Sequence, residues 1–164
     1  MSTEIEQKKE LVKKEIEAKK DLIVKEIDRH LEGFEKRRKY NRTKTFTTHM
    51  LIILLGGLVT FSNGLGKFEF FDIEMAEITQ IISMILGVII TGIGAYNGFF
   101  NNKRFWVVYT STTNGLKKIK SDLSYYIAGK PVHDIDLNKL QIIKDKIQEV
   151  LDETNSEWAS VRNN

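Results

Sequence analysis

The sequence predicts an all-α membrane protein: a long, coiled-coil-like N-terminal helix, a two-helix transmembrane hairpin and a C-terminal helical hairpin, assembled as a homo-oligomeric bundle. Three observations predict this class: an 11-residue repeat, two long uncharged runs after it, and apolar residues at helical spacing in the last third of the chain. We expect three regions: a stalk with a basic collar (1–44), a membrane hairpin (45–102) and a C-terminal helical region (103–164).

The stalk is predicted by three successive copies of an 11-residue unit in residues 4–36, EIEQKKELVKK, EIEAKKDLIVK and EIDRHLEGFEK. Eleven residues over three turns give about 3.67 residues per turn, which is typical of straight or slightly right-handed helical bundles. Six apolar residues of the repeat fall on one face: Ile5, Val12, Ile16, Ile23, Ile27 and Phe34. The narrow stripe and alternating charge signs favour a coil between copies over a solvated helix or one lying on the membrane. Gly33 predicts a bend or break before the collar.

Two uncharged runs predict the membrane hairpin. Residues 78–102 hold no Lys, Arg, Asp, Glu or His over 25 positions, and residues 46–66 carry only His49. A helix of 25 residues extends about 37 Å, enough to cross a hydrocarbon core of about 30 Å, whereas apolar runs of buried core helices are shorter. Gly56 and Gly57 are expected to let the first span pack closely against the second.

The distribution of charge predicts the orientation of the hairpin. The net charge of the chain is +3, but residues 1–44 and 103–130 are basic and flank the spans, whereas the connector from 67 to 77 holds four carboxylates and one lysine. Lysine and arginine remain on the cytoplasmic side of a membrane, so both termini are expected there and the connector outside. Because neither soluble part is long enough to bury a core alone, oligomerisation is expected.

A stripe of small and polar residues runs along the second span. It includes Ser83, Gly87, Thr91, Gly94 or Ala95, and Gly98, with one GxxxG motif at Gly94 and Gly98, and Asn97 lies near its cytoplasmic end. Membrane helices pack closely through such stripes, and the same residues would line a narrow pore if several copies surrounded an axis. Both readings stay open, and the larger residues Ile82, Ile85, Ile89 and Ile93 are expected to face lipid or the first span.

The C-terminal region is expected to form two antiparallel helices. The first continues from the second span, buries Leu116, Ile119, Leu123 and Ile127, and ends at Gly129 and Pro131. The second runs from about Asp136 to Trp158 and buries Leu140, Ile143, Ile147, Val150, Leu151 and Trp158.

Basic and aromatic residues alternate in the first of these helices. The candidates for binding a phosphate-bearing ligand are Lys103, Arg104, Trp106, Tyr109, Lys117, Lys118, Lys120 and Tyr125. Lysines could neutralise phosphates while bases stack on the rings. The alternative, a collar that contacts anionic lipid headgroups, is favoured by the residues alone.

Residues 34–130 resemble the SLATT family, two-span effectors of bacterial nucleotide-signalling immunity. The resemblance lies in the charged arm, the hairpin and then Trp106, Tyr109, Leu116, Lys117, Tyr125 and Gly129, while Thr110 and Asn114 stand where family members often have Arg and Glu. It implies an antiviral pore-forming effector in the bacterial inner membrane. In the similar Hailong-type systems, a partner nucleotidyltransferase makes a DNA oligomer that holds the channel closed.

We therefore expect a homo-oligomeric ion channel, with a tetramer favoured, that is gated by a nucleotide or short DNA oligomer and arrests growth or kills the cell when open. A nonconducting membrane-anchored coiled-coil scaffold and a holin-like permeabilising protein remain alternatives. An enzyme is not expected, and no cofactor or metal is predicted, because the chain has no cysteine and its histidines, His30, His49 and His133, are isolated.

Overall fold

The computed structural model describes residues 2–65 and 73–163, which form four α-helices and one short 3₁₀-helix. The α-helices are α1 (Ser2–Leu65), α2 (Ile73–Phe100), α3 (Asn102–Ile127) and α4 (Leu137–Asn163), and η1 (Val132–Asp134) lies between the last two. No strand occurs in these two ranges, so the all-α prediction is confirmed. The connector predicted to lie outside the membrane falls mostly beyond the described residues.

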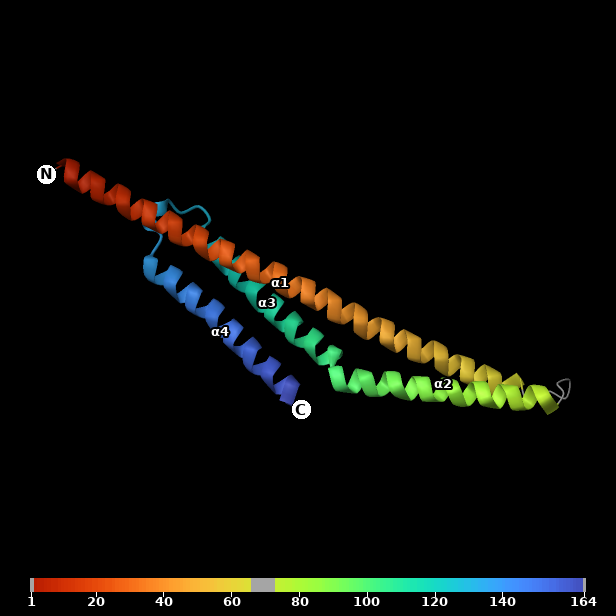
Figure 1. The fold of residues 1–164 in the computed structure, drawn as a ribbon. Coiled ribbons are helices and arrows are strands. Elements are labelled where there is room, and N and C mark those ends of the chain that lie inside the picture. Colours follow the sequence, from red (N-terminus) through yellow and green to blue (C-terminus); the bar gives the residue numbers. More distant parts are fainter. Residues whose placement is uncertain (1, 66–72, 164) are drawn as a thin grey trace. The chain divides into compact units, whose positions relative to one another are not determined.

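The chain divides into two compact units. Residues 40–104 form one unit, hereafter the hairpin, which contains the C-terminal part of α1 and all of α2. Residues 1–39 and 105–164 form the other, hereafter the bundle, in which the N-terminal part of α1 lies beside α3 and α4 (Figure 1).

The core of the bundle is built from the apolar faces of all three helices. Fully or almost fully buried residues come from α1 (Ile16, Ile23, Ile27, Leu31), α3 (Leu116, Ile119, Leu123) and α4 (Leu140, Ile147), with Ile135 from the turn before α4. The predicted faces of α3 and α4 are confirmed except at Trp158, which was expected to be buried but is 38% exposed because it lies at the edge of the bundle, beside the ring of Phe105. From Ile16 to Phe34 the apolar face of the repeat is therefore covered within the same chain, and the two soluble parts bury a core together. Val12 is 44% exposed, and the side chain of Ile5 lies outside the described residues.

The helix ends in the bundle follow from local chemistry. Gly129 adopts φ +72°, which glycine accepts without steric cost, and Pro131 follows it, so α3 ends where the sequence predicted. The carboxylate of Asp136 accepts a hydrogen bond of 2.9 Å from the backbone N–H of Asn138 and caps α4. The backbone N–H of Asp136 in turn donates to the Tyr126 hydroxyl at 2.9 Å, which ties this turn to α3.

Two expectations about helix continuity are wrong. The helix α1 runs through Gly33 without a break, because one glycine costs only about 1 kcal/mol and the packed residues on either side offset it. Conversely, α3 is not an extension of α2. Asn101 adopts φ +44°, a left-handed conformation that asparagine tolerates better than most residues, and it separates the two helices.

Two helices of the chain are long and apolar enough to cross a membrane, and almost none of the residues in their most apolar windows are buried. Large apolar side chains are exposed along both helices of the hairpin, among them Ile53, Phe61, Met84, Val88 and Phe99. In water this much exposed apolar surface would favour aggregation or association, whereas lipid can cover it.

Candidate functional site

The stripe of small residues on α2 is divided between two environments. Ser83, Gly87 and Asn97 lie on the half-buried side of α2, together with Leu86 and Ile90. Thr91 and Gly94 are exposed, and the Thr91 hydroxyl donates a hydrogen bond of 2.9 Å to the carbonyl of Gly87. These residues are therefore half-buried at Ser83, Gly87 and Asn97, and open at Thr91 and Gly94 between them.

The register of the hairpin is set near residue 44. The ammonium of Lys44 lies 5.4 Å from the ring centroid of Tyr96 and 5.6 Å from that of Phe100. Because antiparallel helices advance equally in opposite directions, counting from this contact places Gly56 at the level of Leu86 and Val59 at that of Ser83. All four of these residues are half-buried, which agrees with this register.

The glycines of the hairpin are not needed for packing within one chain. A Cβ atom placed on Gly56, Gly57, Gly87, Gly92, Gly94 or Gly98 would have no neighbouring atom within 4 Å. The expectation that Gly56 and Gly57 allow the two spans to approach closely is therefore wrong for the single chain. Gly115 in the bundle differs, because a Cβ there would lie 3.4 Å from a methyl group of Val150.

Unpaired polar atoms also distinguish the two units. Among the described residues, three buried side-chain atoms lack a hydrogen-bond partner: Thr45 Oγ1, Ser83 Oγ and Asn102 Nδ2. All three belong to the hairpin. The buried threonines of the bundle are hydrogen-bonded. The hydroxyl oxygens of Thr112 and Thr154 lie 2.7 Å apart, and the Thr113 hydroxyl donates to the carbonyl of Tyr109 at 2.6 Å.

The basic and aromatic candidates in α3 do not form one surface. Tyr109 is buried, with its ring 5.9 Å from that of Phe34 and 6.4 Å from that of Phe105. Trp106 is half-buried, whereas Lys103 and Arg104 are exposed. Thr110 donates its hydroxyl to the carbonyl of Trp106 at 2.8 Å. Tyr109 thus serves the core and offers no ring on which a base could stack.

Two of the candidate lysines are paired with carboxylates of α1. Lys117 Nζ lies 2.6 Å from Glu35 Oε1, and Lys120 Nζ lies 2.5 Å from Asp28 Oδ1. The hydrogen bond from Lys117, followed by its positive charge, lowers the pKa of Glu35 below 4.5. All four side chains are about one-third to one-half exposed, so an anionic ligand could compete for either lysine.

Lys118 and Tyr125 are placed differently. They are seven residues apart on the side of α3 that points away from the core, and Tyr125 is 88% exposed. Of the predicted ligand-binding residues within the bundle, these two keep a charge and a ring available to solvent.

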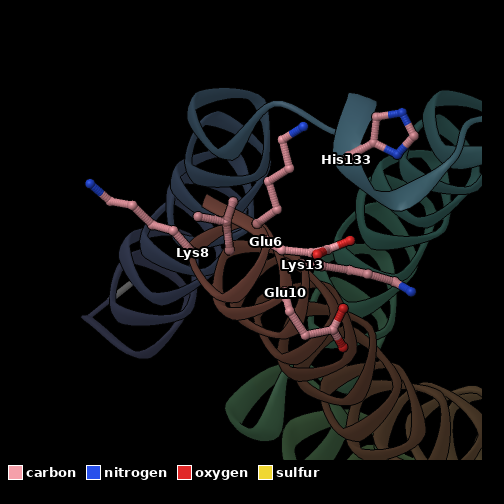
Figure 2. Close-up of a pocket in the computed structure, with 7 residues that line it drawn as sticks. Glu6, Lys8, Glu10, Lys13 and His133 are labelled. Carbon is pink, nitrogen blue, oxygen red and sulfur yellow. The ribbon is translucent and has the colours of Figure 1, made fainter. Parts of the chain in front are cut away.

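A large open hollow of about 680 Å³ lies beside the first turns of α1, lined by Glu6, Lys8, Lys9, Glu10, Val12, Lys13 and His133. Figure 2 shows that Lys8 and Glu10 point away from the His133 ring. Charges of both signs alternate here as on any solvated helix face. The hollow holds no convergent set of groups for a ligand. Within the described residues, no three His, Cys, Asp or Glu side chains are grouped to hold a metal ion.

Sequence reasoning missed the partners of the basic residues. Asp28 and Glu35 lie seven positions apart, which places them on one face of α1, but the antiparallel contact with α3 was needed to pair them with lysines. Tyr40 and Lys44 lie four positions apart, as do Tyr96 and Phe100. This spacing could have indicated an aromatic cluster once the two spans were aligned.

No family model, curated protein or solved structure matches this chain. The resemblance to SLATT effectors therefore stays a prediction.

Proposed function

We propose that the chain is the subunit of a homo-oligomeric membrane channel, in which copies of the hairpin surround a pore and the bundle senses a nucleotide signal. The observation that carries the proposal is the open side of α2. Thr91, Gly94 and their neighbouring glycines have no neighbour in the single chain that would require a small residue. Contact with other copies, or a narrow lumen, explains small residues at these positions.

The bundle favours this proposal over a coiled-coil scaffold. A scaffold that recruits partners through its stalk needs an available apolar stripe, but Ile16, Ile23 and Ile27 are covered by α3 and α4 of the same chain. Among the described side chains of the arm, Leu11, Val12 and Leu22 remain exposed, and of these only Val12 belongs to the apolar stripe of the repeat. A holin-like protein would also insert in a membrane, but it has no need of a folded bundle of about 100 residues.

The signalling part of the proposal is supported by the resemblance to SLATT effectors. It implies a bacterial inner-membrane protein with cytoplasmic termini, a partner nucleotidyltransferase and a role in antiviral defence, with membrane disruption as the outcome. A tetramer is favoured, and each bundle would contribute Lys118 and Tyr125 on its open side. Lys117 and Lys120 would exchange their carboxylate partners for ligand phosphates.

Ion flux into liposomes tests conduction. Purified protein should release a trapped ion, and the double variant Gly87→Phe/Thr91→Phe should abolish the release. Thr91 lies on the open side of α2, and Gly87 lies one turn before it with free space around a Cβ, so two rings there would fill a narrow lumen. Ile85→Phe is the matched control, since Ile85 lies on the opposite side of α2 and should tolerate a ring in lipid. Flux equal to the parent from the inserted and assembled double variant would reject the pore assignment.

Charge reversal at Lys117, Lys118 and Lys120 tests the sensor. Short DNA oligomers and cyclic nucleotides would be added in turn to liposomes that contain the parent, to find the ligand that changes its ion flux. The same ligand would then be added to Lys117→Glu, Lys118→Glu and Lys120→Glu, and we expect it to lose its effect on Lys118→Glu. Lys146→Glu on α4 is the control, because it reverses an exposed lysine of the same bundle. An unchanged response in all three variants would reject these residues as the sensor.

A further inference from the structure

One cation of the hairpin lies among three aromatic rings. The ammonium of Lys44 is 5.6 Å from the ring centroid of Tyr40, 5.4 Å from that of Tyr96 and 5.6 Å from that of Phe100. Each distance is within the range of about 6 Å over which a ring attracts a cation. The rings come from α1 and α2 and fix the ammonium between the two helices.

The cluster keeps hydrogen-bond donors free. Hydrogen bonding to the Tyr96 hydroxyl raises the pKa of Lys44, so the ammonium is charged at every physiological pH. The Tyr40 hydroxyl accepts from the ammonium as well, which leaves one of its three N–H groups, and the Tyr40 and Tyr96 hydroxyls each retain a proton to donate. Tyr40 is 63% exposed and Tyr96 41%, so these donors are accessible from outside the chain.

Among the described side chains of the hairpin, no carboxylate lies close enough to balance this charge. Of the side chains described in residues 40–64 and 77–104, the only acidic one is Glu77, which is 19 positions before Tyr96 and thus about 28 Å away along α2. Arg42, two positions before Lys44, and Lys103, three positions after Phe100, add further positive charge. A site of this composition attracts an anion.

The surroundings of the cluster select the kind of anion. The uncharged spans begin at residues next to it, and Phe99, 84% exposed, packs edge-on against Phe100 with centroids 5.2 Å apart. Tyrosines and basic residues at the end of a span are typical of the headgroup region, where basic pockets between helices bind anionic lipids. A soluble phosphate would use the donors but leave Phe99 and Phe100 uncovered, whereas a phospholipid would satisfy both.

We propose that Lys44, Tyr40 and Tyr96 bind the phosphodiester of one anionic phospholipid, whose acyl chain covers Phe99 and Phe100. The site requires insertion of the hairpin in a membrane but neither conduction nor a nucleotide signal.

Native mass spectrometry of the full-length protein released from detergent tests the site, with phosphatidylglycerol and phosphatidylcholine as probes. We expect a preference for phosphatidylglycerol that falls about tenfold in Lys44→Gln and about threefold in Tyr96→Phe, as for loss of a charged and a neutral hydrogen bond. Lys44→Arg should retain most of the preference. Lys39→Gln removes the same charge from the same basic stretch and should change it less than twofold.

Circular dichroism would verify that each variant keeps its helix content. Equal losses in Lys39→Gln and Lys44→Gln would overturn the proposal in favour of diffuse attraction by the collar. Displacement of phosphatidylglycerol by an equal concentration of inorganic phosphate would assign the site to soluble anions. A protein that conducts no ions but keeps the Lys44-dependent preference would reject the channel and retain the lipid site.

Discussion

The bundle and the hairpin differ in how the apolar stripes of their helices are covered. Both consist of helices with apolar stripes, but the stripes of the bundle meet within the chain, and its buried hydroxyls are paired. The hairpin leaves most large apolar side chains exposed, keeps glycines that nothing in the chain requires, and holds three unpaired buried polar atoms. The comparison teaches that the bundle satisfies its apolar and polar groups within one chain, whereas the hairpin leaves many of its own uncovered, as the proposed insertion in lipid and assembly with further copies would explain.

The largest contrast is expected from truncating one isoleucine in each unit. Ile27 is fully buried, and Ile27→Ala should lower the free energy of unfolding of the bundle by about 2–5 kcal/mol through the cavity it leaves. Ile53 is 65% exposed in the hairpin, and Ile53→Ala should change the free energy of unfolding by less than about 0.5 kcal/mol. Urea unfolding in mild detergent, followed by circular dichroism, measures both. Similar losses would show that the hairpin packs within the chain as tightly as the bundle.

Leucine in place of glycine sharpens the comparison. Gly115→Leu should destabilise the bundle by about 1–3 kcal/mol, because even a Cβ would touch Val150 at 3.4 Å. Gly94→Leu has open space and should leave unfolding unchanged while it disrupts assembly of the hairpins. Thermal unfolding and size-exclusion chromatography separate the two effects. A stable, fully assembled Gly94→Leu protein would contradict the role given to the open side of α2.

The threonine pair of the bundle should show strong coupling. The two hydroxyls of Thr112 and Thr154 have only two protons for three close contacts, the one between them and one to each helix carbonyl. Thr112→Val or Thr154→Val alone should cost about 1 kcal/mol, and the double variant little more than either single one. Additive losses in a double-mutant cycle would show that the hydroxyls act independently.

The smallest effect is expected at the Lys117–Glu35 ion pair. Because the folded-state pKa of Glu35 is lowered, the pair stabilises the bundle above the unfolded value of about 4.5 and loses this contribution as pH falls through the lower folded value. Lys117→Met should flatten the dependence of stability on pH in the acid range below the unfolded pKa of Glu35. Stability measured against pH in the parent and in Lys117→Met tests this; identical acid limbs would show that exposure to solvent screens the pair.

The sequence predicts most of the bundle's secondary structure and the apolar faces of its helices, but not which helices these faces pack against. Period and turn residues locate the faces of α3 and α4 and the end at Gly129, because these depend on local chemistry. The partner of the α1 stripe could not be predicted, because an apolar face at residues 16, 23 and 27 is satisfied equally well by another copy or by a segment about 90 residues later. For the same reason, the ion pairs of Lys117 with Glu35 and of Lys120 with Asp28 could not be predicted.

In the hairpin, the uncharged runs predict the spans, but the stripe cannot distinguish packing from a pore. Ser83 and Gly87 turn partly inward and Thr91 outward because register, rather than composition, decides which side of α2 meets α1. Asn101 was not recognised as a break because asparagine alone is compatible with a continuing helix.

The most direct test uses the absence of cysteine from the chain. Thr91→Cys and Ile85→Cys would each be recorded in a planar bilayer before and after addition of a membrane-impermeant thiol reagent. We predict discrete current steps in both, blocked by the reagent in Thr91→Cys and unaffected in Ile85→Cys. Block of Ile85→Cys alone, or a silent bilayer with correctly inserted protein, would contradict a channel lined by the open side of α2.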